Sequence, residues 1–165
     1  MAQQLDSLDR QILSLVADNA RIPFLEVARV CNVSGAAIHQ RIQKLQQLGV
    51  LVGSEFVVDT YRIGYQTCAF VGIAVSNVKV IDNVVNELKK IPEIVELHSV
   101  TGSYSLLAKI YTKDNRHLMK LIIEQISTIN GVSHTETMHM SLNEHFHRQL
   151  NVFKDSLPAD YKHNQ

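Results

Sequence analysis

Residues 24–51 read FLEVARVCNVSGAAIHQRIQKLQQLGVL, and this stretch decides the fold of the N-terminal part of the chain. A helix pattern runs to Cys31, a tight turn follows, and a second helix pattern begins at Gly35. Ser34 is a good N-cap because its hydroxyl can accept a hydrogen bond from an amide of the first helical turn. Gly49 suits the position after the helix end. The stretch therefore predicts two short helices joined by a turn.

The second of these helix patterns has two unlike faces. Its apolar stripe consists of Ile38, Ile42, Leu45 and Leu48. A helix that is slim at its N-terminus suits the DNA major groove, where glutamine reads adenine with two hydrogen bonds and Arg or Lys reaches guanine or phosphate. We interpret the stretch as a helix-turn-helix whose recognition helix starts at Ser34. The candidate DNA-binding residues are Ser34, Ala36, His39, Gln40, Arg41, Gln43, Lys44 and Gln47.

A plainer interpretation of this stretch stays open. Two short amphipathic helices joined by a turn occur in many small domains, and polar residues opposite an apolar stripe often face only solvent. The preceding residues favour the DNA interpretation, because residues 5–20 predict a further helix with Asp6 as its cap and Asp9 in its first turn. Pro23 is placed as a first-turn proline of the next helix. The expected buried side of that helix is Leu25, Val27, Ala28 and Cys31.

The residues after the recognition helix predict a wing. Residues 50–58 are rich in β-branched side chains and are broken by Gly53, a pattern typical of a short hairpin. Residues 59–65 are polar and read as a linker. The sequence thus predicts a winged helix-turn-helix domain over residues 1–58.

The charge of the chain sets a condition on DNA binding. The 165 residues are 45% apolar, enough for buried cores, and the formal net charge is zero. Duplex binding is driven largely by neutralisation of phosphates, so a neutral chain binds weakly as a single copy. The segment from Arg21 to Val50 has a local balance of +3, because Glu26 is its one acidic residue. Its basic residues are Arg21, Arg29, Arg41 and Lys44. Several copies held together bind better through effective concentration, which favours an oligomer.

Beyond residue 66 the pattern changes to strands and helices in the order βαββαβ. The strand patterns are residues 67–75, 94–100, 104–111 and 132–142, and the helix patterns are residues 80–91 and 118–129. Two βαβ halves predict a ferredoxin-like sandwich over residues 66–143. The predicted fold class is therefore α+β, an N-terminal winged helix-turn-helix plus a C-terminal ferredoxin-like βαββαβ domain.

The first strand of this domain predicts a second subunit. Both helices of a ferredoxin-like unit lie on one sheet face, yet residues 69–75 are apolar on both faces. We therefore expect another copy of the chain to cover the other face. The final segment, residues 144–165, is read as a helix and tail, with the helix pattern over residues 143–157 ended by Pro158.

Taken together, these residues resemble the Lrp/AsnC family of leucine-responsive, or feast/famine, regulators. The matching motifs are Leu5-Asp6-x-x-Asp9-Arg10-x-Ile12-Leu13, Asn19-Ala20-Arg21-Ile22, Ser34 through Arg41-Ile42-x-x-Leu45, Gly49-Val50-Leu51, Gly64, Ile91-Pro92-Glu93-Ile94-Val95 and Gly102-x-Tyr104. The resemblance implies a sequence-specific transcriptional regulator that binds double-stranded DNA. It also implies a C-terminal domain that forms dimers and octamers and binds small effectors, commonly amino acids.

The resemblance further implies an effector site at contacts between C-terminal domains. The implied residues are Gly102, Ser103, Tyr104 and Ser105 of one loop, with Thr135, Glu136 and Thr137 of the last strand of a neighbouring subunit. In the family an Asp commonly follows the tyrosine, and this chain has Ser105, so the usual partner of an ammonium group is missing. Glu136 can replace it or can simply face solvent. We expect weak binding of simple amino acids, with a preference for apolar side chains.

Other chemistries have little support in the sequence. Cys-x-x-Cys, His-Glu-x-x-His and Gly-x-Ser-x-Gly spacings are absent, so we assign no catalytic residue, no metal ligand and no cofactor. His145 and His147 lie beside Glu144, but side chains at i and i+2 of a helix do not face each other. Two alternatives stay open: an oligomeric ligand-binding module without a DNA function, and a metal-dependent enzyme.

The sequence also carries signals about location. No apolar run approaches the ~20 residues that a membrane span needs, and no secretory signal is visible at the N-terminus. Cys31 and Cys68 are isolated, which fits a reducing compartment. We expect a cytoplasmic protein that does not enter a membrane.

Overall fold

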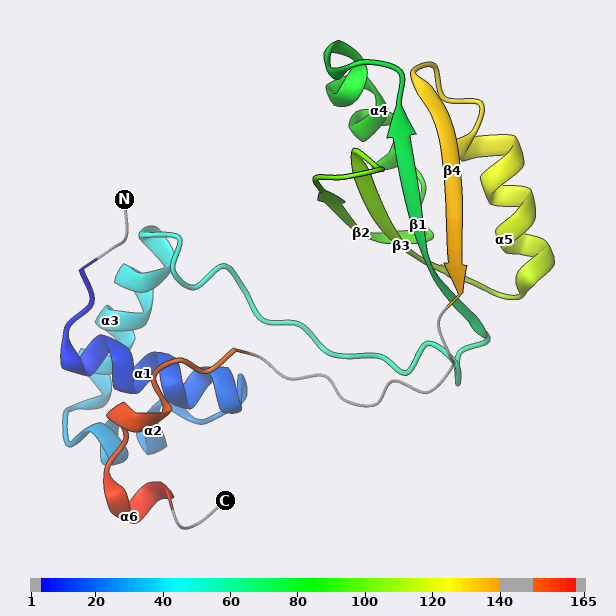
Figure 1. Cartoon of the computed structure of the whole chain (residues 1–165). Helices are drawn as coiled ribbons and strands as arrows, with labels where there is room; N and C mark the ends of the chain where they lie inside the picture. The colour runs from blue at the N-terminus through cyan, green and yellow to red at the C-terminus, as the bar shows by residue number, and fades with distance from the viewer. Residues whose placement is uncertain (1–3, 140–149, 163–165) are drawn as a thin grey trace. The chain divides into compact units, whose positions relative to one another are not determined.

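A computed structural model describes residues 4–139 and 150–162 of the chain, which form two compact units (Figure 1). Of the described residues, the first unit contains 4–56 together with 150–162, and the second contains 57–139. The fold class predicted from the sequence is confirmed, with a helical N-terminal unit followed by a four-stranded antiparallel sheet with helices.

The first unit is built on helices α1 (Ser7–Asp18), α2 (Phe24–Cys31) and α3 (Gly35–Gln47). Asp6 caps α1 as predicted, because its carboxylate accepts from the Asp9 amide while the Asp9 carboxylate accepts from the Asp6 amide. Ser34 caps α3 by accepting from the Ala37 amide at 3.2 Å. Gly49 has a φ of +66°, so its left-handed conformation ends α3 without strain.

The core of this unit joins all three helices. Its buried side chains are Ile12, Leu15, Ile22, Val27, Ala28, Ile38, Ile42, Leu45 and Leu157. For two residues the prediction of an inward-facing apolar side chain is wrong. Leu25 is 79% exposed because it lies in the first turn of α2 away from the buried Val27 and Ala28, and Leu48 is 40% exposed because it is the cap residue that follows α3.

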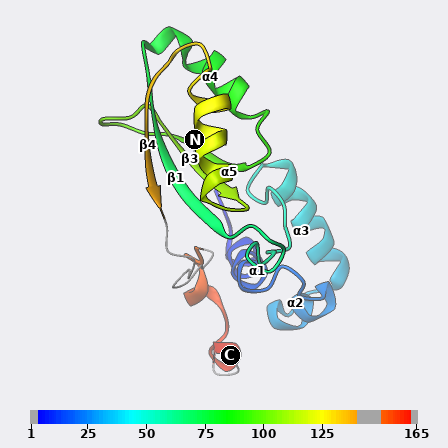
Figure 2. The same ribbon diagram turned by 90° about the vertical axis from the view of Figure 1, so that its right-hand side faces the viewer.

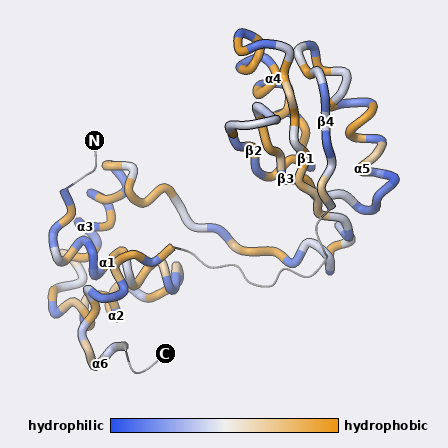
Figure 3. The backbone as a smooth tube through the Cα atoms, in the orientation of Figure 1, coloured by the Kyte–Doolittle hydropathy of each residue, from blue (hydrophilic) through white to orange (hydrophobic). Residues whose placement is uncertain are grey.

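The wing is a second correction. Residues 50–58 are all described and contain no strand; they run as an extended segment with an apolar stretch at residues 56–58 (Figure 3). β-branched residues favour an extended backbone, but a hairpin also needs two strands paired in register. The chain does not turn back on itself at Gly53 to form such a pair. The Arg21 guanidinium lies 4.0 Å from the centroid of the Phe56 ring, which holds the later part of this segment on the helical unit.

The second unit is a sheet with strand order β2-β3-β1-β4, the order of a ferredoxin-like domain. Its strands are β1 (Thr67–Val75), β2 (Ile94–Ser99), β3 (Leu106–Thr112) and β4 (Val132–His139), and all neighbours are antiparallel. Its helical elements are η1 (Val78–Val80), α4 (Ile81–Leu88) and α5 (Asn115–Leu121), with α5 continuing as the π-helical turn η2 (Ile122–Ile126).

The helices of this unit cover one face of its sheet (Figure 2). Ala69, Val71 and Ile73 of β1 point into the core shared with Val84, Leu88, Leu118, Leu121 and Ile126 of the helices. The alternate residues of β1 point to the opposite face, since successive side chains of a strand alternate. That face carries Cys68, Phe70, Gly72 and Ala74. The apolar character on both sides of β1 is thus present as the sequence predicts.

The C-terminal segment differs from the predicted helix. Residues 143–149 of that prediction lie outside the described residues. Residues 150–157 contain only the 3-10 turn η3 (Lys154–Ser156), and a short helix α6 (Ala159–Lys162) follows Pro158. Within residues 150–157 the predicted helical stripe does not form a buried face, since Leu150 is 83% exposed and Leu157 is the buried apolar side chain. Among the described helices, none is long and apolar enough to cross a membrane.

Candidate nucleic-acid interface and effector loop

The outer face of α3 presents a polar stripe. Ala36, Gln40, Gln43 and Gln47 are spaced by four, three and four residues, so they lie in one row along the helix, and all are exposed. The buried row Ile38, Ile42 and Leu45 lies on the opposite side. The structure therefore brings four of the candidate DNA-binding residues into one accessible row.

Two other candidates lie beside this row. A nitrogen of His39 is 3.2 Å from the Gln43 amide nitrogen, and the His39 ring lies 6.2 Å from the Phe24 ring of α2. His39 is thus in position to orient the Gln43 amide. Ser34 is exposed, but its hydroxyl already accepts the capping hydrogen bond, so its local role is to start the helix.

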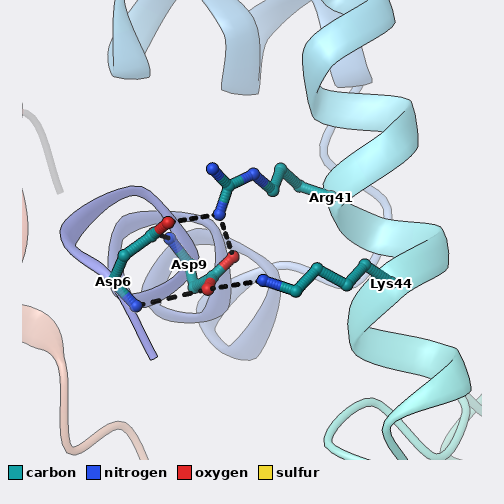
Figure 4. Close-up of polar contacts among 4 residues, drawn as sticks. All are labelled: Asp6, Asp9, Arg41 and Lys44. Carbon is teal, nitrogen blue, oxygen red and sulfur yellow. Dashed lines mark hydrogen bonds and ion pairs between the residues drawn. The ribbon is translucent and has the colours of Figure 1, made fainter. Parts of the chain in front are cut away.

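Arg41 and Lys44 lie on the flank of α3 that faces α1 (Figure 4). Arg41 donates to the Asp9 carboxylate at 3.0 Å and also pairs with Asp6. The Lys44 ammonium is 3.7 Å from the other Asp9 oxygen. The Asp9 side chain is only 1% exposed, so the buried carboxylate is compensated by two cations and by the Asp6 amide.

These contacts shift two pKa values. The pKa of Asp6 lies below its ordinary value, first because its carboxylate accepts from the Asp9 amide and second because it pairs with Arg41. The pKa of Arg41 is raised further by Asp6 and Asp9. Asp6 and Arg41 are therefore charged at neutral pH, and their contact joins α1 to α3 at the candidate recognition helix.

This cluster changes the electrostatic picture of the helix-turn-helix. Over residues 4–56 the basic side chains are Arg10, Arg21, Arg29, Arg41 and Lys44, and the acidic ones are Asp6, Asp9, Asp18, Glu26 and Glu55, so the formal charge is zero. The +3 counted between Arg21 and Val50 is thus balanced by carboxylates outside that segment. Arg29 is also paired, 2.6 Å from Glu26. Exposed amides, rather than a basic patch, dominate the outer face of α3.

The effector loop is placed against the sheet by a glycine. A Cβ built on Gly72 would lie 2.7 Å from the Tyr104 ring, so the ring rests where the side chain of residue 72 would otherwise be. The Ser105 amide donates to the Ile73 carbonyl at 3.0 Å, and the Val100 amide donates to the Ser105 carbonyl. Gly102 has a φ of +121°, which allows the turn.

The structure divides the three candidate residues of β4 between the two sheet faces. Glu136 pairs directly with Gly72, so its side chain lies on the face that carries the Tyr104 ring. Thr135 pairs with Ile73 and Thr137 with Val71, so both point to the helix-covered face. Within one chain, only Glu136 of these three shares a face with Tyr104.

A second polar cluster lies further along that face. Glu96 of β2 is 3.2 Å from both His98 and Lys109. The pKa of the Glu96 carboxyl is lowered by these hydrogen bonds, with His98 the larger cause. Burial raises the pKa of Tyr111, whose directly opposite neighbour on β1 is Cys68. The face is therefore mixed, with apolar residues on β1 and polar groups on β2 and β3.

Sequence reasoning missed two residues that position these sites. Asp9 was read as a helix-dipole carboxylate, and its burial between two cations of α3 depends on helix packing that the sequence does not display. Gly72 had a readable signal, because an isolated glycine inside a strand pattern marks a close approach. Within the described residues no group of three His, Cys, Asp or Glu side chains is placed to hold a metal ion, while His145 and His147 lie outside them.

Comparison with known proteins gives the family. Residues 5–46 match the AsnC-type helix-turn-helix domain, and residues 68–150 match the Lrp/AsnC ligand binding domain. The regulatory protein AsnC of Haemophilus influenzae is 34% identical over 134 residues, which span 81% of this chain and 89% of that protein.

Solved structures agree with these matches. The structure of Escherichia coli AsnC superposes with a TM-score of 0.82 at 30% identity, covering 90% of this chain and 99% of that one. A feast or famine regulatory protein of Mycobacterium tuberculosis, complexed with L-methionine, has a TM-score of 0.81 at 26% identity and covers 87% of this chain and 96% of its own. With both units matched in sequence and in structure, the chain belongs to the Lrp/AsnC family.

Proposed function

We propose that this protein is a sequence-specific DNA-binding transcriptional regulator that reads double-stranded DNA with α3. The observation that carries the proposal is the exposed row Ala36, Gln40, Gln43 and Gln47 on a capped helix within an AsnC-type helix-turn-helix. Small and amide side chains in one row let the helix enter a major groove and hydrogen-bond base edges. Family membership favours this function over a ligand module without DNA binding and over a metal-dependent enzyme.

The candidate residues take different roles in this proposal. Gln40, Gln43 and Gln47 read bases, with His39 orienting Gln43 through their 3.2 Å contact. Ala36 leaves room for close approach to the bases, and Ser34 starts the helix. Lys44 is half exposed and reaches a phosphate from its flank. Arg41, paired with two carboxylates, is a positioning residue that fixes α3 on α1.

The test of DNA reading begins with mapping the genomic DNA that the protein binds, with and without a panel of amino acids. Gln43→Ala should then reduce discrimination between the mapped site and random duplex by about 1–3 kcal/mol, because one bidentate base contact is lost. Gln46→Ala is the matched control, since Gln46 is an exposed glutamine of the same helix outside the row. Equal discrimination in the parent and in Gln43→Ala contradicts the proposed reading face.

Assembly is the second part of the proposal. The sheet face that carries Cys68, Phe70 and Ala74 is apolar along β1, and apolar area of this kind is stabilised by burial against another surface. We expect a second copy of the chain to cover it, giving at least a dimer, with an octamer as the larger assembly. A dimer also carries two helix-turn-helix units, so that once one unit is bound to DNA the other is held near the duplex at a high effective concentration. A full-length monomer in sedimentation at micromolar concentration contradicts this assembly.

The effector is proposed to be an amino acid with an apolar side chain, held at the loop of residues 100–105. The related M. tuberculosis protein complexed with L-methionine supports this class of ligand. The candidate contacts are Gly102, Ser103, Tyr104 and Ser105 from one subunit and Glu136 from another. Thr135 and Thr137, which point to the helix-covered face, flank Glu136 rather than face the loop. Ser105 carries no charge, so Glu136, which shares the face of Tyr104, is the proposed partner of the ammonium group.

Calorimetry with L-methionine tests this site. Ser105→Asp should bind about tenfold to over a hundredfold more tightly than the parent, because a charge-assisted hydrogen bond is worth about 1.5–3 kcal/mol. Glu136→Gln should weaken what binding the parent has. Tight parent binding that survives Glu136→Gln, or no gain in Ser105→Asp, shows that the ligand lies elsewhere.

A further inference from the structure

The segment of residues 150–162 packs on the first helix of the DNA-binding unit. The Asn151 side-chain nitrogen donates to the Ser14 carbonyl at 3.0 Å, to the Ser14 hydroxyl at 3.2 Å and to the Asp18 carboxylate at 2.8 Å. Ser14 is fully buried although it is polar. One amide thus satisfies groups on the C-terminal half of α1, more than 130 residues earlier in the sequence.

The same segment also contributes to the hydrophobic core of that unit. Leu157 is 5% exposed and belongs to the cluster of Ile12, Leu15 and Val27, and Tyr161 packs at its margin. Pro158 separates η3 from α6 and keeps the segment from continuing as one helix. Polar and apolar contacts at two points specify one docked position better than either contact alone.

Residues 150–162 follow the last strand of the sheet unit in the sequence but pack on the helical unit. The two family matches cover residues 5–46 and 68–150, so most of the docked segment lies beyond both. It follows β4, whose last residue is His139 and which carries the candidate effector residue Glu136. The helix-turn-helix unit is therefore connected to the sheet by the chain before β1 and by the chain after β4.

We propose that residues 150–162, named here the strap, are a docking segment that binds α1 and so ties the DNA-binding unit to the chain that follows strand β4. The occupant of the α1 surface is thus the chain's own C-terminal segment. Tethering makes the contact intramolecular, so a small interface holds at any protein concentration. The cost of closing the loop grows only slowly with its length. The inference concerns how the two units are coupled and stands whether or not α3 reads DNA.

Hydrogen exchange on the full-length protein tests the strap. Leu157→Asp places a carboxylate in the core of the helical unit and should release the strap. Amides of residues 12–18 in α1 should then exchange roughly tenfold faster or more, while amides of β1 keep their protection. Leu150→Asp is the matched control, because Leu150 belongs to the strap but is 83% exposed. It should leave exchange in α1 unchanged.

A milder variant covers the case in which Leu157→Asp disturbs the whole protein. Asn151→Ala removes an amide that donates its two hydrogens among three acceptors on α1, without touching the core, and should speed exchange at residues 14–18 roughly two- to tenfold. Faster exchange in α1 for Asn151→Ala, with Leu150→Asp as the parent, supports the strap. Unchanged α1 exchange in both Asn151→Ala and Leu157→Asp overturns it, as does an equal response to Leu150→Asp.

Discussion

Helix α3 and the loop of residues 100–105 are held in place by opposite means. The helix is fixed by added groups, since a buried carboxylate on α1 binds two of its cations. The loop is fixed by a missing group, since the Tyr104 ring fills the space that a side chain at Gly72 would take. The position of α3 therefore depends on ion pairs that a loss of charge or added salt weakens. The position of the loop depends on close packing, which one added methyl group at residue 72 would disturb.

The largest expected effect comes from removing the buried carboxylate that holds α3 on α1. Asp9→Asn leaves Arg41 and Lys44 facing a neutral amide and should lower the free energy of unfolding of the helical unit by about 2–3 kcal/mol. The figure stays below that of a fully buried ion pair because both cations are partly exposed. Chemical denaturation measures it. Glu26→Gln, which removes an exposed pair with Arg29, is the control and should cost under about 1 kcal/mol.

The second prediction disturbs the packing of the Tyr104 ring on Gly72. Gly72→Ala forces the Tyr104 ring away from its 2.7 Å approach and should cost about 1–2 kcal/mol of stability. In a Tyr104→Ala background the same change should be nearly neutral, because the ring is gone. Denaturation of the two single variants and the double variant gives the coupling energy. Strict additivity of the two changes contradicts the contact.

The same contrast explains what the sequence could and could not predict. Caps at Asp6 and Ser34, and the strand at residues 67–75, follow from local rules and are confirmed. The predicted wing at residues 50–58 is wrong because a hairpin depends on a partner strand. The predicted helix at residues 143–157 is wrong over residues 150–157, where the long-range contacts of Asn151 and Leu157 with α1 hold an irregular segment. The pairing of Asp9 with Arg41 joins residues 32 apart, so no local pattern contains it.

A third prediction sharpens the roles of the two cations on α3. Lys44→Gln should reduce the salt slope of DNA binding by about one unit, because one phosphate contact is lost. Arg41→Gln should weaken DNA binding but leave the slope nearly unchanged, because its charge is already committed to Asp6 and Asp9. Titrations at several salt concentrations measure both slopes. Equal loss of slope in the two variants means that Arg41 contacts phosphate directly.

The smallest effect concerns pH. The folded-state pKa of Asp6 is lowered, so its contribution to stability is present above the ordinary aspartate range near ~4 and is lost as pH falls through the lowered value. Because this carboxylate is about half exposed, the contribution is under about 1 kcal/mol. Asp6→Asn should flatten this part of the stability curve between pH 5 and about 2. The sheet unit, followed separately by hydrogen exchange, should keep its own acid dependence, which includes Glu96.

The contact between Tyr104 and Gly72 also makes the loop visible to spectroscopy. Protons held against the face of an aromatic ring are shielded by its ring current, so the α-protons of Gly72 should resonate upfield of those of other glycines in the chain. Any ligand that lifts the loop moves the ring and returns these resonances toward their usual position. Gly72 is thus an intrinsic NMR label for loop movement, in a chain that has five tyrosines and no tryptophan to serve as a fluorescent one.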